Sequence, residues 1–186
     1  MFENERIRLR KVTIADAPIY NKWRNDTEVM YSTSPELDQF TLSETEKFIG
    51  FITESPNGKS YMIETKEDNQ TVGIISLIDI NHKDRSAECI IDIGEKEKWG
   101  QGIGRDAFEL LLNYAFNELN FHRLYLRVFS FNRRAITLYK KLGFKEEGIM
   151  REAFYRSGQW HDVHVMGILK REYISDNQSL DMKKEV

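Results

Sequence analysis

The sequence predicts a single α+β domain built on a mainly antiparallel mixed sheet flanked by helices. Two observations predict it. Strand-like and helix-like segments follow one another in the order β, α, α, β, β, β, α, β, α, β, β. A length of 186 residues with 40% hydrophobic side chains suits one compact core. We expect the domain to span residues 1–174, and residues 175–186, which are polar and lack periodicity, to form a disordered tail.

The first third of the chain is expected to hold one strand and two helices. Residues 7–10 alternate apolar and basic side chains as in a short strand, and Asp16 can begin the helix that follows. Residues 31–40 are rich in small and turn-forming side chains, which predicts a loop. A second helix is expected over about residues 42–53, before a turn at 55–58.

The middle of the chain is expected to form three strands and then a helix. The strands lie over residues 61–65, 72–80 and 87–93, and short turns between them indicate an antiparallel meander. From Ile103 the apolar period becomes that of a helix.

The last third is expected to add three strands and one helix. Residues 124–129 have strand character, and the helix after them is expected to begin at Asn132 and to end at Gly143. Two further strands are expected within residues 144–171, on either side of a turn at 156–159.

Composition argues against several classes of partner. With 27 basic and 30 acidic residues, the net charge of −3 offers no basic surface for nucleic acid. The single cysteine, Cys89, excludes an internal disulfide and suits a reducing compartment. No segment has the roughly 18 to 20 apolar residues of a membrane span. His161 and His164 are expected on opposite faces of a strand, which argues against a metal site. We therefore expect a cytoplasmic protein without nucleic-acid, membrane or metal partners.

The strongest chemical signal lies between an expected strand and an expected helix. It is the segment Trp99-Gly100-Gln101-Gly102-Ile103-Gly104-Arg105. Glycines allow main-chain amides to converge, and the start of a helix adds unpaired N–H groups and a positive dipole end. Such a segment can hold an anion such as a pyrophosphate. A glycine-rich segment alone more often only turns the chain, so a second motif is needed.

A second motif is present, and the pair resembles the GNAT superfamily of N-acetyltransferases. Gly102 and Gly104 match the small positions of the family's Gln/Arg-x-x-Gly-x-Gly/Ala motif. Trp99 stands at the Gln/Arg position, as in the branch that contains ribosomal-protein N-terminal and spermidine N-acetyltransferases. Residues 132–144, Asn-Arg-Arg-Ala-Ile-Thr-Leu-Tyr-Lys-Lys-Leu-Gly-Phe, are similar to the family's second segment almost throughout.

The resemblance extends over about residues 6–173 and is weakest over 31–40, whereas residues 81–88 look particularly like spermidine enzymes. It implies a sheet with splayed central strands and acetyl-CoA as the acetyl donor. The cofactor-binding residues that it implies are Ile91, Asp92, Ile93, Trp99, Gly100, Gln101, Gly102, Ile103, Gly104, Arg105, Asn132, Ala135, Tyr139 and Lys141.

The resemblance also implies catalytic roles in a direct attack of an amine on acetyl-CoA within a ternary complex. Tyr139 matches the tyrosine that approaches the CoA sulfur, and a phenol can donate a proton to the departing thiolate. For the base, Glu88 is the first candidate and Asp92, on the same strand face, is the second. An ordinary solvated strand face and a base made of a water chain stay open.

The acceptor stays open between a polyamine such as spermidine or spermine, the N-terminus of a ribosomal protein, and a small amino-sugar or amino-acid amine. Acidic residues near the first two helices could attract a polyamine or be ordinary surface charges: Asp26, Glu28, Glu36 and Asp38. The alternative function is a CoA-binding sensor or interaction module that lacks catalysis. The resemblance is compatible with a homo-oligomer.

Overall fold

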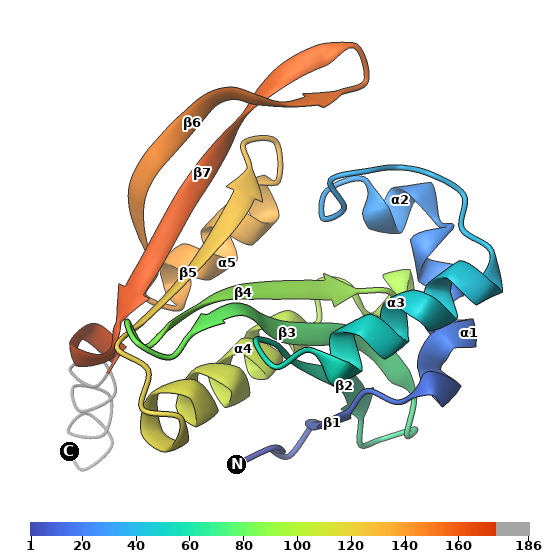
Figure 1. Ribbon diagram of the computed structural model, residues 1–186, viewed down its shortest axis with the longest axis horizontal. Helices are drawn as coiled ribbons and strands as arrows, with labels where there is room; N and C mark the ends of the chain where they lie inside the picture. Colours follow the sequence, from blue (N-terminus) through green and yellow to red (C-terminus); the bar gives the residue numbers. More distant parts are fainter. Residues whose placement is uncertain (174–186) are drawn as a thin grey trace.

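The computed structural model describes residues 1–173, in which seven strands form one sheet (Figure 1). The strands are β1 (Ile7–Lys11), β2 (Lys59–Thr65), β3 (Thr71–Asn81), β4 (Ser86–Ile93), β5 (Arg123–Phe129), β6 (Lys145–Arg156) and β7 (Gln159–Leu169). Their order is β1-β2-β3-β4-β5-β7-β6, and the pairing is antiparallel except between β4 and β5. The expected α+β class with a mainly antiparallel mixed sheet is confirmed. That residues 1–174 are one domain stays a prediction, and the expected tail over 175–186 lies outside the described residues.

Helices cover both faces of the sheet. One cluster of buried side chains joins the sheet to α1 (Ala17–Arg24), α2 (Thr27–Met30) and α3 (Leu42–Glu54). A second cluster joins it to α4 (Ile103–Asn113) and α5 (Arg133–Lys141). No helix within the described residues has the length and apolar character of a membrane span.

Local sequence accounts for the helix that carries the second motif. Asn132 caps α5, since its side-chain oxygen accepts a hydrogen bond from the Ala135 amide at 3.1 Å. Gly143 ends it with a φ of 90°, in the left-handed region that favours glycine. Both ends agree with the sequence prediction.

Several short helical turns were not expected, among them α2 and a turn beyond α4. The short helix α2 depends on Asp26, whose carboxylate accepts hydrogen bonds from the amides of Glu28 and Val29. Four residues are too few for a periodic apolar pattern, which is why α2 could not be predicted from the sequence. Beyond α4, the chain continues as a π-helical turn over Tyr114–Glu118.

Trp23 fixes the position of the chain just before the glycine-rich segment. Its ring is fully buried, and its indole N–H donates to the Glu95 carboxylate at 2.8 Å. Gly94 passes directly beneath this ring, where a Cβ atom would lie 2.0 Å from the nearest ring carbon. The close approach requires glycine and anchors the end of β4 against α1.

The sheet opens between β4 and β5. These strands pair only over three residues, Ser86–Glu88 against Arg123–Tyr125. Beyond that point, β4 continues its pairing with β3 and β5 continues with β7. Figure 1 shows the two strands diverging, with the β6–β7 hairpin bending away from the β1–β4 half of the sheet. The expected splay of the central strands is thus confirmed, and β4 presents main-chain groups that have no β5 partner.

Candidate functional site

The glycine-rich segment forms a tight turn that leads into α4. Gly100 and Gly102 have φ angles of 79° and 85°, where residues with a Cβ atom are strained. The first main-chain bond of α4 runs from the amide of Asp106 to the oxygen of Gly102 at 3.0 Å. The three amides of residues 103–105 therefore precede the helical ladder and are available to an anion at the positive end of the helix.

The Trp99 side chain joins this turn to β4 and to α5. Its indole N–H donates to the main-chain oxygen of Ile93, the last residue of β4, at 2.8 Å. The guanidinium of Arg134, on α5, lies 5.8 Å from the centre of its ring. Trp99 thus positions the turn through a bond within the chain, and the indole links β4 to α5.

Gly104 brings the start of α4 close to β4 and α5. A Cβ atom at this position would lie 3.7 Å from Leu138 of α5 and 3.8 Å from Ile91 of β4, which is ordinary van der Waals contact. Ile91 and Ile93 pack on the same side of the sheet as α4. The structure therefore brings together β4, the turn and α5, as the resemblance implies.

Tyr139 lies in the core beside the opening between β4 and β5. It is 8% exposed, and its ring meets Phe108 edge to face at 5.3 Å. Burial raises the pKa of this phenol, and the nearby charges of Asp92 and Cys89 raise it further. The hydroxyl stays protonated at neutral pH, which is the state that a proton donor requires.

Asp92 is a buried carboxyl that is poorly satisfied. It is 9% exposed, and within the described residues its Oδ1 atom has no hydrogen-bond partner. Burial raises the pKa of the Asp92 carboxyl, and the nearby Thr33 side chain partly opposes the rise. The carboxylate also raises the pKa of the Tyr20 and Tyr139 phenols, which places it near both rings. A carboxylate with a raised pKa and a vacant lone pair is suited to accept a proton.

Glu88 has a different environment. Although it is only 3% exposed, both of its oxygens accept hydrogen bonds from Arg127, each at 2.9 Å. It lies where β4 and β5 still pair, at the narrow end of the splay. Its lone pairs are engaged in an ion pair that joins the two strands.

The other predicted cofactor residues divide into two groups. Ile103 is buried in the core, and Ala135 is partly buried with its amide bonded to the Asn132 cap. Arg105 and Lys141 are exposed, and Arg105 pairs with Glu109 at 2.7 Å. The Gln101 side chain donates to the main-chain oxygen of Glu97 at 2.6 Å, which further braces the turn.

Sequence reasoning missed Tyr20 and Thr33, which lie near Asp92, and Arg156, which binds the loop that contains Thr33. Tyr20 was read only as part of an apolar helix face, Thr33 as part of a loop, and Arg156 as part of a turn. Loops carry no periodic signal, and the contacts of Thr33 and Arg156 join segments more than 50 residues apart. An arginine beside a hairpin turn is informative only when it is known to be buried, and burial is not visible in the sequence.

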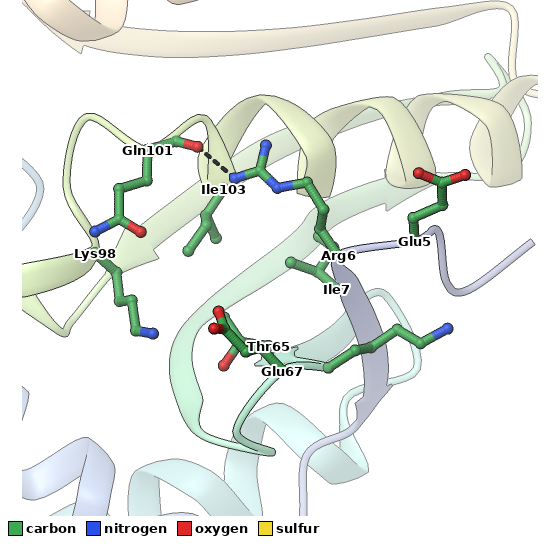
Figure 2. A pocket seen from close by; sticks show the side chains of 9 residues that line it. Glu5, Arg6, Ile7, Thr65, Glu67, Lys98, Gln101 and Ile103 are labelled. Atoms are coloured by element: carbon green, nitrogen blue, oxygen red, sulfur yellow. Dashed lines mark hydrogen bonds between the residues drawn. The ribbon is translucent and has the colours of Figure 1, made fainter.

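A pocket of about 310 Å³ lies on the outer side of the turn (Figure 2). Side chains of both charges line it, among them Glu5, Arg6, Lys66, Glu67 and Lys98. Figure 2 shows the Arg6 guanidinium against the main-chain oxygen of Gln101. A Cβ atom at Gly102 would meet this guanidinium at 3.3 Å, so Arg6 packs directly against the turn.

Comparison with known proteins settles the family. Residues 6–145 match the acetyltransferase (GNAT) domain. The chain belongs to the GNAT acetyltransferase family. Spermidine N(1)-acetyltransferase from Vibrio cholerae is 30% identical over 176 residues, which cover 94% of this chain and 99% of that protein.

Solved structures from the same organism share the fold. A spermidine N-acetyltransferase in complex with CoA and spermine has a TM-score of 0.85 at 30% identity, and the alignment covers 92% of this chain and 99% of that one. A dodecameric structure of spermidine N-acetyltransferase has a TM-score of 0.78 at 29% identity, covering 91% and 97%. This GNAT protein is an N-acetyltransferase that uses acetyl-CoA as its acetyl donor, and the sequence prediction of an enzyme is confirmed.

Proposed function

We propose that this GNAT enzyme acetylates a primary amine of a polyamine such as spermidine or spermine, by direct attack on acetyl-CoA in a ternary complex. The observation that carries the mechanism is the proximity of the buried Asp92 carboxyl to the Tyr139 phenol beside the splay. The full-length similarity to the Vibrio enzyme supports the acceptor class. The N-terminus of a ribosomal protein is the second candidate acceptor, retained because Trp99 also fits that branch.

The residues at the opening between β4 and β5 suit acetyl-CoA as the donor. The amides of residues 103–105 and the left-handed glycines suit a pyrophosphate, and the unpaired edge of β4 over Ile91, Asp92 and Ile93 suits an amide-containing arm. Acetyl-CoA supplies an activated thioester. Within that arrangement Asn132 holds the start of α5, and α5 in turn places Tyr139 at the opening.

Asp92 is the better candidate for the base, in place of Glu88. A base must accept a proton from the ammonium group of the acceptor so that the neutral nitrogen can bond to the acetyl carbon. Asp92 has a lone pair without a partner and a raised pKa, whereas both oxygens of Glu88 are bound to Arg127. When the carbon–sulfur bond breaks, the Tyr139 hydroxyl donates its proton to the thiolate. The second proton that the acylated nitrogen loses as the amide forms returns the phenolate to the phenol.

A panel of amines tests the acceptor. The release of CoA thiol from acetyl-CoA is measured with spermidine, spermine, a short peptide with a ribosomal-protein N-terminus, and an amino sugar. We expect kcat/KM for a polyamine to exceed that for the peptide and the sugar by at least about tenfold, a difference of about 1.4 kcal/mol in transition-state binding. A higher kcat/KM for the peptide would reject the polyamine in favour of the second candidate.

We further propose that the enzyme is a homo-oligomer. The dodecameric relative supports this assembly, and so does the exposed β6–β7 hairpin, in which Tyr155 and Trp160 are 57% and 61% exposed. β6 is an edge strand, which leaves main-chain groups free to pair with another chain. Light scattering coupled to size-exclusion chromatography tests this, and a monomer at micromolar concentration would contradict it. The cytoplasmic location expected from the sequence stays a prediction.

A further inference from the structure

Arg6 lies just before β1 and reaches across to the glycine-rich turn. Both of its main-chain polar groups are held: the amide donates to the Asn4 side chain at 2.8 Å, and the oxygen accepts from the Lys66 amide at 2.8 Å. Ile7, the next residue, is fully buried. The guanidinium therefore extends toward the turn from a fixed point at the edge of the sheet, as Figure 2 shows.

The Arg6 guanidinium contacts three parts of the turn. Its Nη2 donates to the main-chain oxygen of Gln101. Its Nη1 lies 3.3 Å from Oδ2 of Asp106, in the first turn of α4. A Cβ atom at Gly102 would lie 3.3 Å from the same Nη1, so the guanidinium packs against the left-handed residue at which α4 begins. One side chain thus joins the residue before the helix, its cap and its first turn.

Stability explains little of this arrangement. The Arg6 side chain is 52% exposed, and ion pairs of exposed side chains contribute about 0 to 1 kcal/mol. The Asp106 side chain is only 14% exposed, and its Oδ2 atom accepts no hydrogen bond from any residue in the range 1–173. Arg6 therefore offsets a poorly solvated negative charge beside the start of α4.

The charge of Asp106 affects any anion that the turn binds. The amides of residues 103–105 precede the helical ladder, which begins with the amide of Asp106. A carboxylate in the first turn suits the positive end of the helix dipole, but it repels a second anion bound there. The guanidinium offsets that repulsion. Its hydrogen bond to Gln101 also holds the peptide before Gly102, and with it the direction in which the turn enters the helix.

We propose that Arg6 is a positioning residue for the acetyl donor, which holds the glycine-rich turn in its anion-binding conformation and offsets the charge of Asp106. This inference rests on the proposed function, in which the amides of residues 103–105 bind the pyrophosphate of acetyl-CoA. Arg6 acts through Gln101 and Asp106, so it affects the affinity for the donor and not the chemical step at Asp92 and Tyr139.

Arg6→Gln tests the inference against Arg8→Gln. Arg8 is a matched control, since its side chain is 43% exposed and pairs with the Glu64 carboxylate of β2 at 2.6 Å. We expect R6Q to raise the Kd of CoA, measured by calorimetry, about tenfold, and R8Q to leave it within about twofold of the wild type. The two variants are expected to lose similar stability in urea. The kcat of R6Q at saturating acetyl-CoA is expected to match that of the wild type.

A truncated donor separates this role from a general loss of structure. S-acetylpantetheine carries the thioester and the amide-containing arm of acetyl-CoA but has no phosphate groups. In R6Q we expect kcat/KM to fall about tenfold with acetyl-CoA and to stay within about twofold of the wild type with S-acetylpantetheine. A distorted fold would lower both values.

Asp106→Asn tests the role of the charge. In the R6Q background this substitution removes the carboxylate that Arg6 offsets in the wild type. The R6Q/D106N double variant is therefore expected to bind CoA at least about threefold more tightly than R6Q.

Three results would overturn the inference: the same Kd of CoA in R6Q and R8Q, an equal loss of kcat/KM with both donors, or a double variant that binds CoA no more tightly than R6Q. If R6Q fails to fold, Arg6→Lys is compared with Arg8→Lys, because lysine cannot engage Gln101 and Asp106 together with a rigid fork. Equal Kd values for that pair then reject the idea. Failure of the proposed pyrophosphate site is recognised separately, because Gly104→Val would then also leave the Kd of the donor unchanged.

Discussion

Asp92→Asn separates the role of this carboxyl in catalysis from its cost in the folded protein. Asparagine has nearly the same shape but cannot accept the proton of an ammonium group. If Asp92 is the base, kcat/KM falls by about 10² to 10⁴-fold, the usual contribution of a positioned general base. The acid limb that reports the titration of the carboxyl in the free enzyme disappears in the variant.

Stability is expected to move the other way. Asp92 is 9% exposed and its Oδ1 has no partner within residues 1–173, so the ionised form bears a desolvation cost of about 1 to 3 kcal/mol. Because the folded pKa is raised, the native protein binds more protons than the unfolded chain between the ordinary carboxyl pKa of about 3.9 and the folded value. Wild-type stability therefore falls as the pH rises through that window, and the variant lacks this fall.

Urea denaturation at several pH values and kcat/KM profiles over the same range measure both effects. We expect D92N to be at least as stable as the wild type at pH 8. The difference in the free energy of unfolding, about 1 kcal/mol, is expected to appear at the pH where the acid limb of the wild-type kcat/KM profile ends. Asp84→Asn, at the exposed turn between β3 and β4, serves as the control and is expected to change neither quantity. A D92N enzyme with the wild-type acid limb would refute the assignment of the base.

Three more substitutions test other parts of the site. Tyr139→Phe keeps the contact with Phe108 and is expected to lower kcat by about 10²-fold with an acetyl-CoA Kd within about twofold of the wild type by calorimetry; an unchanged kcat would exclude Tyr139 as the proton donor. Gly104→Val adds atoms beyond the Cβ position, which alone would be in ordinary contact, and is expected to raise the acetyl-CoA Kd at least about tenfold. Gly50→Ala, which faces open space, is expected to leave the Kd unchanged. Equal affinities of the two variants would reject the amides of residues 103–105 as the pyrophosphate site. Glu88→Gln is expected to lower the free energy of unfolding in urea by about 1 to 2 kcal/mol, with little change in kcat. The loss of stability is limited because the half-exposed Arg127 guanidinium can be hydrated once the ion pair is removed. A hundredfold loss of kcat would restore Glu88 as the base.

The parts of the fold that could be predicted are those that local chemistry determines. The apolar period from Ile103 follows from one helix face packing on the sheet, and Asn132 and Gly143 mark the ends of α5 through a cap and a left-handed residue. Antiparallel neighbours with short turns followed from the spacing of β2, β3 and β4. The insertion of β7 between β5 and β6 depends on long-range pairing, and no local pattern in the sequence specified it.

The candidate site shows the same division. Motif residues such as Gly102, Gly104 and Tyr139 could be named in advance, because the resemblance supplied their positions. The ranking of Glu88 above Asp92 came from position on the strand and from the resemblance to related enzymes. Our proposal reverses this order because Arg127 engages both oxygens of Glu88. Partners that reach a group from distant segments decide its chemistry, and these are not visible in the sequence.

The most direct test of the account is a crystal structure of the protein with CoA. We expect the pyrophosphate at the amides of residues 103–105, and the thiol between β4 and β5 within hydrogen-bonding distance of the Tyr139 hydroxyl. CoA bound instead in the outer pocket beside Arg6 and Lys98, or with its thiol remote from both Tyr139 and Asp92, would contradict the central claim that the transfer takes place at the splay.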